Sequence, residues 1–135
     1  MDNNYKKVFE GVIFNVYQWE QKMYDGTFET FEKLKRPNSG LVIPITKDNK
    51  ILLTYQHQPH NPNPFYSLLG GRGEDGEELM DTAKRELLEE SGLQGKKYKE
   101  LLVHKPNSKI DWEIGYFLCK KLTKVKAKNL DAGEK

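Results

Sequence analysis

Apolar and polar residues alternate over the first third of the chain in the pattern typical of half-buried strands. Residues 8–19 are rich in aromatic and β-branched side chains, and a similar pattern resumes over residues 27–33. The dipeptide Asp25-Gly26 lies between these two segments and suits a tight hairpin turn. The pattern therefore predicts an antiparallel pair of strands.

Two shorter apolar runs follow. Residues 41–46 and 51–55 predict a second hairpin, because the polar residues 47–50 between them tolerate turn conformations. Residues 57–64 contain three prolines and two histidines. This composition predicts a surface loop rather than a regular element. A short strand is then expected over residues 65–69.

The periodicity changes in the middle of the chain from that of a strand to that of a helix. Leu79, Ala83 and Leu87 recur at the spacing of one helix face. They predict a helix over residues 77–91 whose apolar stripe packs on a sheet. Gly92 stands where a residue in the left-handed conformation commonly ends a helix.

Further strands are expected after the helix, over residues 98–104 and 112–118, with a turn at 105–109. The predicted fold class is therefore α+β, with an N-terminal antiparallel hairpin.

A chain of 135 residues fits one domain, because a second core would be too small to fold. We expect N-terminal antiparallel strands over residues 1–38 and the core of the domain over residues 39–122. Residues 123–135 are lysine-rich and lack apolar periodicity, and are interpreted as a frayed or truncated tail.

Composition excludes few classes of protein. The 22 basic and 20 acidic residues leave a formal charge of +2, which favours neither nucleic acid nor an acidic membrane as a partner. Residues 1–9 lack the apolar stretch of a signal peptide, and no apolar window has the length of a membrane span. A cytoplasmic protein is expected. Cys119 lies in an apolar run and is expected to be a buried hydrophobe.

The predicted helix carries a cluster of carboxylates. Glu86, Glu89 and Glu90 stand three and four residues apart, which places their side chains on one side of the helix. Like charges at this spacing destabilise a helix by a few tenths of a kcal/mol per pair, and a bound cation would remove that cost. Such a cluster is usually only a solvated face. As a metal site, its oxygen ligands would select Mg²⁺ or Mn²⁺.

The residues around the cluster match a longer motif. It runs glycine, five residues, glutamate, seven residues, then Arg-Glu-aliphatic-any-Glu-Glu-any-Gly-aliphatic. The matching positions are Gly71, Glu77, Arg85, Glu86, Leu87, Glu89, Glu90, Gly92 and Leu93. In this motif the chain resembles the Nudix hydrolase family. The resemblance implies a mixed β-sheet sandwiched by helices, with the motif forming a loop, helix and loop.

The resemblance also implies roles for these residues. Glu86 and Glu90 correspond to metal ligands, and Glu89 to a further ligand or to the base that orients water. Arg85 corresponds to the residue that fixes a glutamate by ion pairing, and the Gly70 carbonyl to an additional ligand. Glu77 would be more structural.

Outside the motif, residues 41–56 and 116–118 and the N-terminal hairpin resemble the branch of the family that acts on ADP-ribose and other sugar nucleotides. The implied substrate is a small nucleoside diphosphate derivative. This chain departs from the pattern of the branch before the motif. Members of the branch usually have Glu-Leu-Pro-Ala-Gly where this chain has Ser67-Leu68-Leu69-Gly70-Gly71. Because members are often dimers, we expect a homodimer, against which sedimentation as a monomer at high concentration would count.

Two functions of other classes stand beside hydrolysis. A nucleotide-binding module of this fold would not cleave its ligand, but it should have lost at least one of the three glutamates, and none is replaced. An RNA-directed protein is suggested only by the lysines of the tail, which no aromatic platform accompanies. Nucleic acid is therefore an unlikely partner.

Several residues outside the motif are weaker candidates. Arg72 and Glu74 could reach a phosphate or a metal-bound water, or could be solvated loop charges. The segment around His57 and His60 could form a specificity loop. Tyr55 or Phe65 could stack on a base, but core packing is the more common role of an aromatic side chain. Glu134 could be a catalytic glutamate, but a residue this close to the end of a chain is more often disordered.

Overall fold

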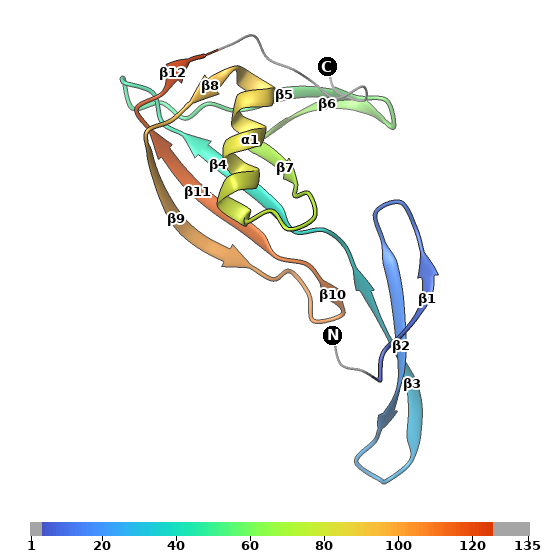
Figure 1. The fold of residues 1–135 in the computed structure, drawn as a ribbon. Coiled ribbons are helices and arrows are strands. Elements are labelled where there is room, and N and C mark those ends of the chain that lie inside the picture. Colours follow the sequence, from blue (N-terminus) through green and yellow to red (C-terminus); the bar gives the residue numbers. More distant parts are fainter. Residues whose placement is uncertain (1–3, 126–135) are drawn as a thin grey trace. The chain divides into compact units, whose positions relative to one another are not determined.

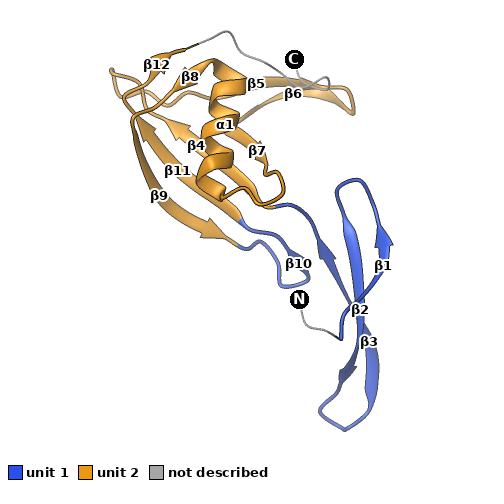
Figure 2. Ribbon diagram, in the orientation of Figure 1, with its two compact units in different colours: residues 1–37, 105–113 blue, residues 38–104, 114–135 orange. Residues whose placement is uncertain are grey.

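The computed structural model describes residues 4–125 and divides into two compact units, residues 1–37 with 105–113 and residues 38–104 with 114–135 (Figure 2). Each unit has its own sheet. That the whole chain forms a single domain stays a prediction.

Unit 1 is a four-stranded sheet in the order β1-β2-β3-β10 (Figure 1). Its strands are β1 (Lys6–Glu10), β2 (Asn15–Lys22), β3 (Phe28–Lys35) and β10 (Ile110–Asp111). The predicted hairpin is confirmed, because β2 and β3 pair antiparallel across a turn in which the Asp25 carboxylate accepts a hydrogen bond from the Thr27 N–H at 2.9 Å. Residues 8–19 are not one strand. The Gly11 N–H donates to the Phe14 carbonyl at 2.9 Å in a turn that separates β1 from β2.

Unit 2 contains a mixed four-stranded sheet in the order β7-β4-β11-β9. Its strands are β4 (Ser39–Pro44), β7 (Leu69–Arg72), β9 (Lys97–His104) and β11 (Ile114–Lys120). β4 and β11 are parallel, and the other pairings are antiparallel. The predicted strand 98–104 is confirmed as β9, and the strand predicted over 112–118 lies two residues later, as β11.

The helix α1 (Leu79–Ser91) packs on one face of this sheet (Figure 1). The predicted apolar stripe is confirmed, because Ala83 and Leu87 are fully buried with Val42, Phe117 and Cys119 in one core cluster. The αL conformation of Gly92 is also confirmed, with a φ of 74° and its N–H donating to the Leu88 carbonyl. Within residues 4–125, α1 is the one helix of those expected to flank the sheet. The α+β class is confirmed.

Two shorter ribbons complete unit 2, and one of them corrects the sequence prediction. They are the pair β5 (Thr54–Gln58) with β6 (Asn61–Ser67) and the pair β8 (Leu93–Gln94) with β12 (Thr123–Lys124). The hairpin predicted from residues 41–46 and 51–55 is reduced to a single bridge between Ile45 and Ile51.

Residues 57–64 are not a loop, because they form most of the β5–β6 hairpin. Both strands of a two-stranded ribbon are edges, and an edge tolerates residues without an N–H donor. Pro62 and Pro64 can therefore lie inside β6.

No helix among the described residues is long and apolar enough to cross a membrane.

Candidate functional site

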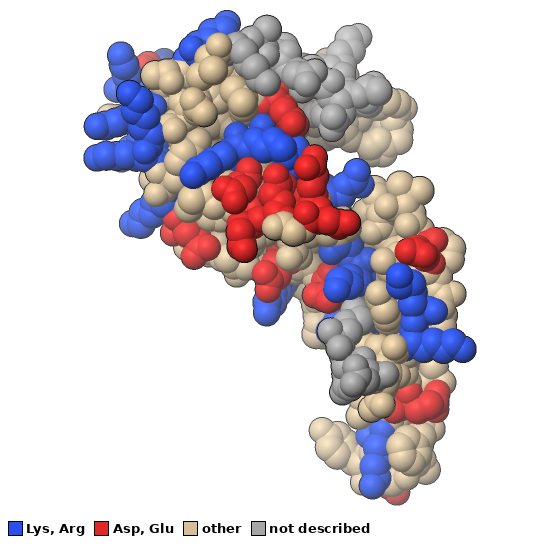
Figure 3. All heavy atoms as spheres, in the orientation of Figure 1, with Lys and Arg blue, Asp and Glu red and all other residues tan. Residues whose placement is uncertain are grey.

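A polar cavity of about 470 Å³ lies in unit 2 beside the middle and the C-terminal half of α1. Acidic side chains gather over this helix in Figure 3. The lining comes from the hairpin β5–β6, from β7 and the loop after it, and from one face of the helix. The lining residues are Gln56, Gln58, Gly70, Gly71, Arg72, Gly73, Glu74, Arg85, Glu86 and Glu89.

Arg85 is the central cation of the site. Its Nε and Nη2 donate to the two carboxylate oxygens of Glu77 at 3.0 and 3.1 Å, a bidentate pair. Its Nη1 lies 3.2 Å from Glu86 Oε1 and 3.2 Å from Glu89 Oε2. A single guanidinium therefore compensates three carboxylates, and its Nη2 is tied to the loop by a bond to the Arg72 carbonyl.

Glu77 anchors the loop to the helix. Its Oε1 accepts hydrogen bonds from the Thr82 hydroxyl at 2.7 Å and from the Glu74 N–H at 3.1 Å. The bond from Arg85 is the main reason that the pKa of Glu77 falls to about 2 from its ordinary value of 4.5. The same bond raises the pKa of Arg85. The pair therefore stays ionised at neutral pH.

This pair predicts a pH-dependent stability. A carboxyl whose folded pKa is depressed stabilises the fold above its unfolded pKa, and that contribution is lost as the pH falls toward its folded pKa. At about 1.4 kcal/mol per pKa unit, Glu77 contributes about 3 kcal/mol at neutral pH. We expect Glu77→Gln to lower the free energy of unfolding by about that amount at pH 7, and the difference from wild type to shrink between pH 4.5 and about 2. Urea denaturation at a series of pH values measures it.

The exposed neighbour Glu78, which makes no side-chain cap bond, supplies the control, and Glu78→Gln should have a small effect that does not vary with pH. A Glu77→Gln difference that stayed constant down to pH 2 would contradict an origin in the ionised carboxylate.

Two further glutamates of the helix are buried against glycines of β7. Glu86 and Glu90 are each only 8% exposed. The Glu90 Oε1 accepts a hydrogen bond from the Gly70 N–H at 2.7 Å. A Cβ on Gly71 would lie 2.6 Å from Glu86 Oε1, so only glycine leaves room for this carboxylate. The glycines therefore let the strand backbone approach the helix carboxylates closely.

The donor set fits a hard divalent cation by its chemistry, since it consists of carboxylate oxygens and glycine carbonyls. The Arg85 Nη1, placed between Glu86 and Glu89, shows that their carboxylates already converge on one positive charge. Among the described residues, no group of three or more acidic, histidine or cysteine side chains is arranged closely enough to hold a metal ion. Backbone oxygens and water would have to complete the coordination, as is usual for Mg²⁺.

The structure brings most of the predicted site residues together. Gly70, Arg85, Glu86 and Glu89 line the cavity, whereas Glu90 does not line it and is joined to it through its bond to Gly70. Two weaker candidates, Arg72 and Glu74, also line it. The other weak candidates Tyr55, His57, His60 and Phe65 do not. Glu134 and the lysines beyond residue 125 lie outside the described residues.

Sequence reasoning missed three polar residues of the site. Gln56 and Gln58 line the cavity from β5, and their amides are linked, with Gln58 Nε2 donating to Gln56 Oε1 at 2.9 Å. The buried Thr82 holds Glu77. The signal for the glutamines was the alternation Thr54, Gln56, Gln58, which sets one face of a strand apart from Tyr55 and His57.

Comparison with known proteins assigns this chain to a family. The NUDIX domain model matches residues 35–132. An "ADP-ribose pyrophosphatase" of Bacillus subtilis (strain 168) is 28% identical over 131 residues, which is 96% of this chain and 71% of that protein. A "methanol dehydrogenase activator" of Bacillus methanolicus is 28% identical over 89 residues, 66% of this chain and 48% of that protein.

Solved structures share the fold. One described as an "ADP compounds hydrolase" superposes with a TM-score of 0.77 at 18% identity, covering 96% of this chain and 71% of its own. A MutT structure, from a study of the Aliivibrio salmonicida and Vibrio cholerae proteins, has a TM-score of 0.55 at 18% identity and covers 73% of this chain and 74% of its own.

Proposed function

Because the chain belongs to the Nudix family and is a Nudix hydrolase, we propose that it hydrolyses the diphosphate linkage of a nucleoside diphosphate joined to a sugar, with ADP-ribose as the leading substrate. Water would add across the P–O–P bond, giving a nucleoside monophosphate and a phosphorylated sugar. The observation that carries the proposal is that the carboxylates of Glu86 and Glu89 both contact the guanidinium of Arg85 at the wall of a polar cavity.

Glu86 and Glu90, with the Gly70 carbonyl and water, would hold Mg²⁺ or Mn²⁺, and Glu89 would be a further ligand or the base. Because no three of the described acidic side chains are grouped closely enough to hold a metal ion by themselves, the carboxylates would close on the cation as it binds. When bound, such a cation neutralises phosphate charge and lowers the pKa of a water. Glu89 is the most exposed of the three carboxylates, with 28% of its side chain accessible, and it lines the cavity. Its exposure to the cavity supports the second of these roles, in which Glu89 accepts the proton of the attacking water.

Arg85 acts as a positioning residue. Its guanidinium fixes the rotamers of Glu86 and Glu89 through Nη1, while its other nitrogens are held by Glu77 and the Arg72 carbonyl. Orientation of ligands by a neighbouring charge of this kind supports metal affinity and activity by factors of about 10 to 100.

The substrate assignment draws on the cavity and on the B. subtilis relative. Gln56 and Gln58 present neutral amides opposite the acidic helix, and amides can donate to phosphate or sugar oxygens. The relative carries the name ADP-ribose pyrophosphatase and aligns with 96% of this chain.

A substrate panel tests the proposal. ADP-ribose, other sugar nucleotides, dinucleoside polyphosphates, nucleoside triphosphates and capped RNA are incubated with Mg²⁺, with Mn²⁺ or with EDTA, and products are followed by ion-exchange chromatography. We expect release of AMP from ADP-ribose with either metal and at least a hundredfold less with EDTA, because the cation supplies several kcal/mol of charge stabilisation. Turnover that EDTA leaves unchanged would contradict the metal, and turnover confined to another substrate would contradict the sugar nucleotide.

We also propose that the protein forms a homodimer and is cytoplasmic. Several apolar side chains of unit 1 are exposed, among them Val8, Phe9, Val12, Phe14 and Phe28. Burial of these side chains against a second copy of the chain would support the dimer. A nucleotide-binding module without activity is disfavoured by the three retained glutamates.

A further inference from the structure

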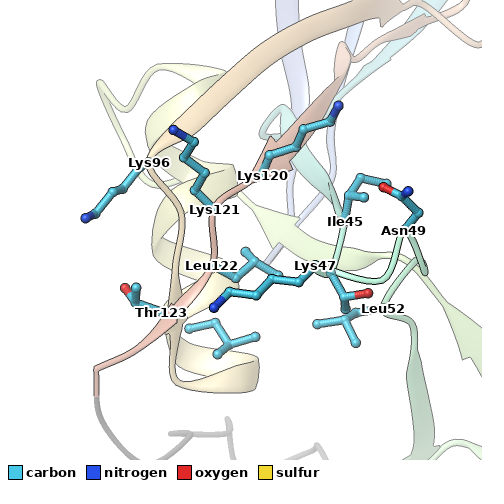
Figure 4. Close-up of a pocket in the computed structure, with 11 residues that line it drawn as sticks. Ile45, Lys47, Asn49, Leu52, Lys96, Lys120, Lys121, Leu122 and Thr123 are labelled. Atoms are coloured by element: carbon cyan, nitrogen blue, oxygen red, sulfur yellow. The ribbon is translucent and has the colours of Figure 1, made fainter.

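A second cavity lies in unit 2, where β4 and β11 end. It has a volume of about 590 Å³ and shares no lining residue with the polar cavity beside α1. Aliphatic side chains form much of its wall, and Figure 4 shows the residues around it. They are Ile45, Leu52, Leu93 and Leu122. A volume of this size accommodates a small organic ligand.

Four exposed lysines line the same cavity, namely Lys47, Lys96, Lys120 and Lys121. None of them forms an ion pair with a carboxylate among residues 4–125. Basic side chains, Lys or Arg, gather at this end of unit 2 in Figure 3. The cavity therefore combines an apolar wall with uncompensated positive charge.

The neighbouring carboxylate of Asp48 is engaged elsewhere. It accepts a hydrogen bond from the Thr46 hydroxyl at 2.6 Å, which is the main reason that its pKa is lowered. It also lies 3.6 Å from Lys50, which does not line the cavity. Asp48 therefore does not neutralise the ammonium group of Lys47, which is available to bind another anion.

Backbone hydrogen bonds tie the walls of this cavity together. The Ile45 N–H donates to the Cys119 carbonyl at 2.8 Å, and the Lys96 N–H donates to the Lys120 carbonyl at 3.2 Å. The backbone segments that carry the four lysines are therefore held together without a ligand. A site that is already formed loses less conformational freedom when it binds.

Two residues that line this cavity have an unusual backbone conformation. Asn49 and Lys121 have φ values of 60° and 58°, and they are the non-glycine residues with positive φ in the described part of the chain. Both line the cavity. Such conformations are uncommon and concentrate at functional sites. At Lys121 the left-handed conformation follows directly on the end of β11 at Lys120.

We propose that this cavity binds an organic phosphate, with its apolar body against the aliphatic wall and its phosphate bound by lysines of the lining. The lysine side chains point in different directions in Figure 4, so they would turn toward the phosphate as it binds. A bare phosphate ion would leave the aliphatic wall unused, and an uncharged apolar compound would leave the lysines uncompensated. Nucleotides and alkyl phosphates share the required chemistry. The proposal is independent of the hydrolytic function, because no residue of the acidic site takes part.

Backbone NMR spectra of the full chain in EDTA test the proposal, with hexyl phosphate as the probe. We expect saturable shifts of the amide signals of Thr46, Lys96 and Thr123, with no shift at Gly70 or Gly71. Lys47→Gln combined with Lys120→Gln should weaken binding about tenfold, because it removes two charged donors. The matched control removes two exposed lysines of unit 1, by Lys6→Gln with Lys22→Gln, and should leave the affinity unchanged.

Three comparison ligands complete the experiment. Tighter binding of AMP than of hexyl phosphate at the same amides would identify a nucleotide as the source, and the reverse order an alkyl phosphate. Inorganic phosphate or hexanol binding as tightly as hexyl phosphate would overturn the proposal, as would the absence of shifts at millimolar probe. Because EDTA suppresses turnover, these outcomes do not depend on whether ADP-ribose is a substrate.

Discussion

Glu86→Gln is expected to lower kcat for ADP-ribose hydrolysis about 1000-fold in saturating Mg²⁺. Glutamine keeps the shape of the side chain and an oxygen that can still accept from Arg85 Nη1. It removes the negative charge from a ligand position, and loss of metal charge stabilisation amounts to about 4 kcal/mol. At about 1.4 kcal/mol per tenfold, this corresponds to three orders of magnitude. Initial rates of AMP release measure it.

Glu78→Gln is the matched control for this variant. Glu78 carries the same charge near the start of the same helix, but it is exposed and makes no side-chain cap bond, so its replacement should change kcat less than twofold. Circular dichroism should show both variants folded, and Mn²⁺ titration should show weaker metal binding for Glu86→Gln alone. Equal rates for the two variants would show that the carboxylate of Glu86 is not required for hydrolysis.

The parts of the fold that the sequence predicted correctly are those governed by local periodicity. Leu79, Ala83 and Leu87 repeat at helical spacing, and the structure buries Ala83 and Leu87 completely. Gly92 ends the helix because its αL conformation has no steric cost for glycine. Such features depend on neighbours within one or two turns and need no knowledge of tertiary contacts.

The errors occur where tertiary context overrides local signals. Three prolines in residues 57–64 predicted a loop, but a two-stranded ribbon has free edges that accept Pro62 and Pro64. Ile51 is apolar and β-branched, yet it forms only a single bridge, because β5 pairs with β6 instead. Pairing partners of strands are set by the whole fold and are not encoded in a short window.

In the candidate site, too, the sequence predicted what local spacing determines and missed what tertiary contacts determine. Spacing alone places Glu86, Glu89 and Glu90 on one side of a helix, and Arg85 was expected to pair with one glutamate. The structure pairs it with three, including Glu77, which is eight residues away. The bond from the Gly70 N–H to Glu90 joins residues twenty apart. Neither contact follows from helical geometry, since one depends on the loop that precedes α1 and the other on the packing of β7 against α1.

Gly70→Ala is expected to lower the free energy of unfolding by about 4 kcal/mol. Gly70 has a φ of 146°, and a Cβ there would collide with the Gly40 carbonyl and lie 2.5 Å from Leu41 Cδ2 and 2.7 Å from Leu41 Cα. Strain in this region of φ costs about 1–3 kcal/mol, and overpacking adds about 1–3 kcal/mol. The close neighbours include backbone atoms of β4, which pairs with β7, so they cannot rotate out of the way.

Gly26→Ala separates the two contributions. Gly26 also has a positive φ, of 89°, but a Cβ there would meet no described atom within 4 Å. Its replacement should therefore cost only the conformational strain, about 1 kcal/mol. Urea denaturation of the two variants measures the difference. Equal losses would mean that the β4–β7 pair moves to accommodate the added methyl group, and the contribution expected from overpacking at Gly70 would then be absent.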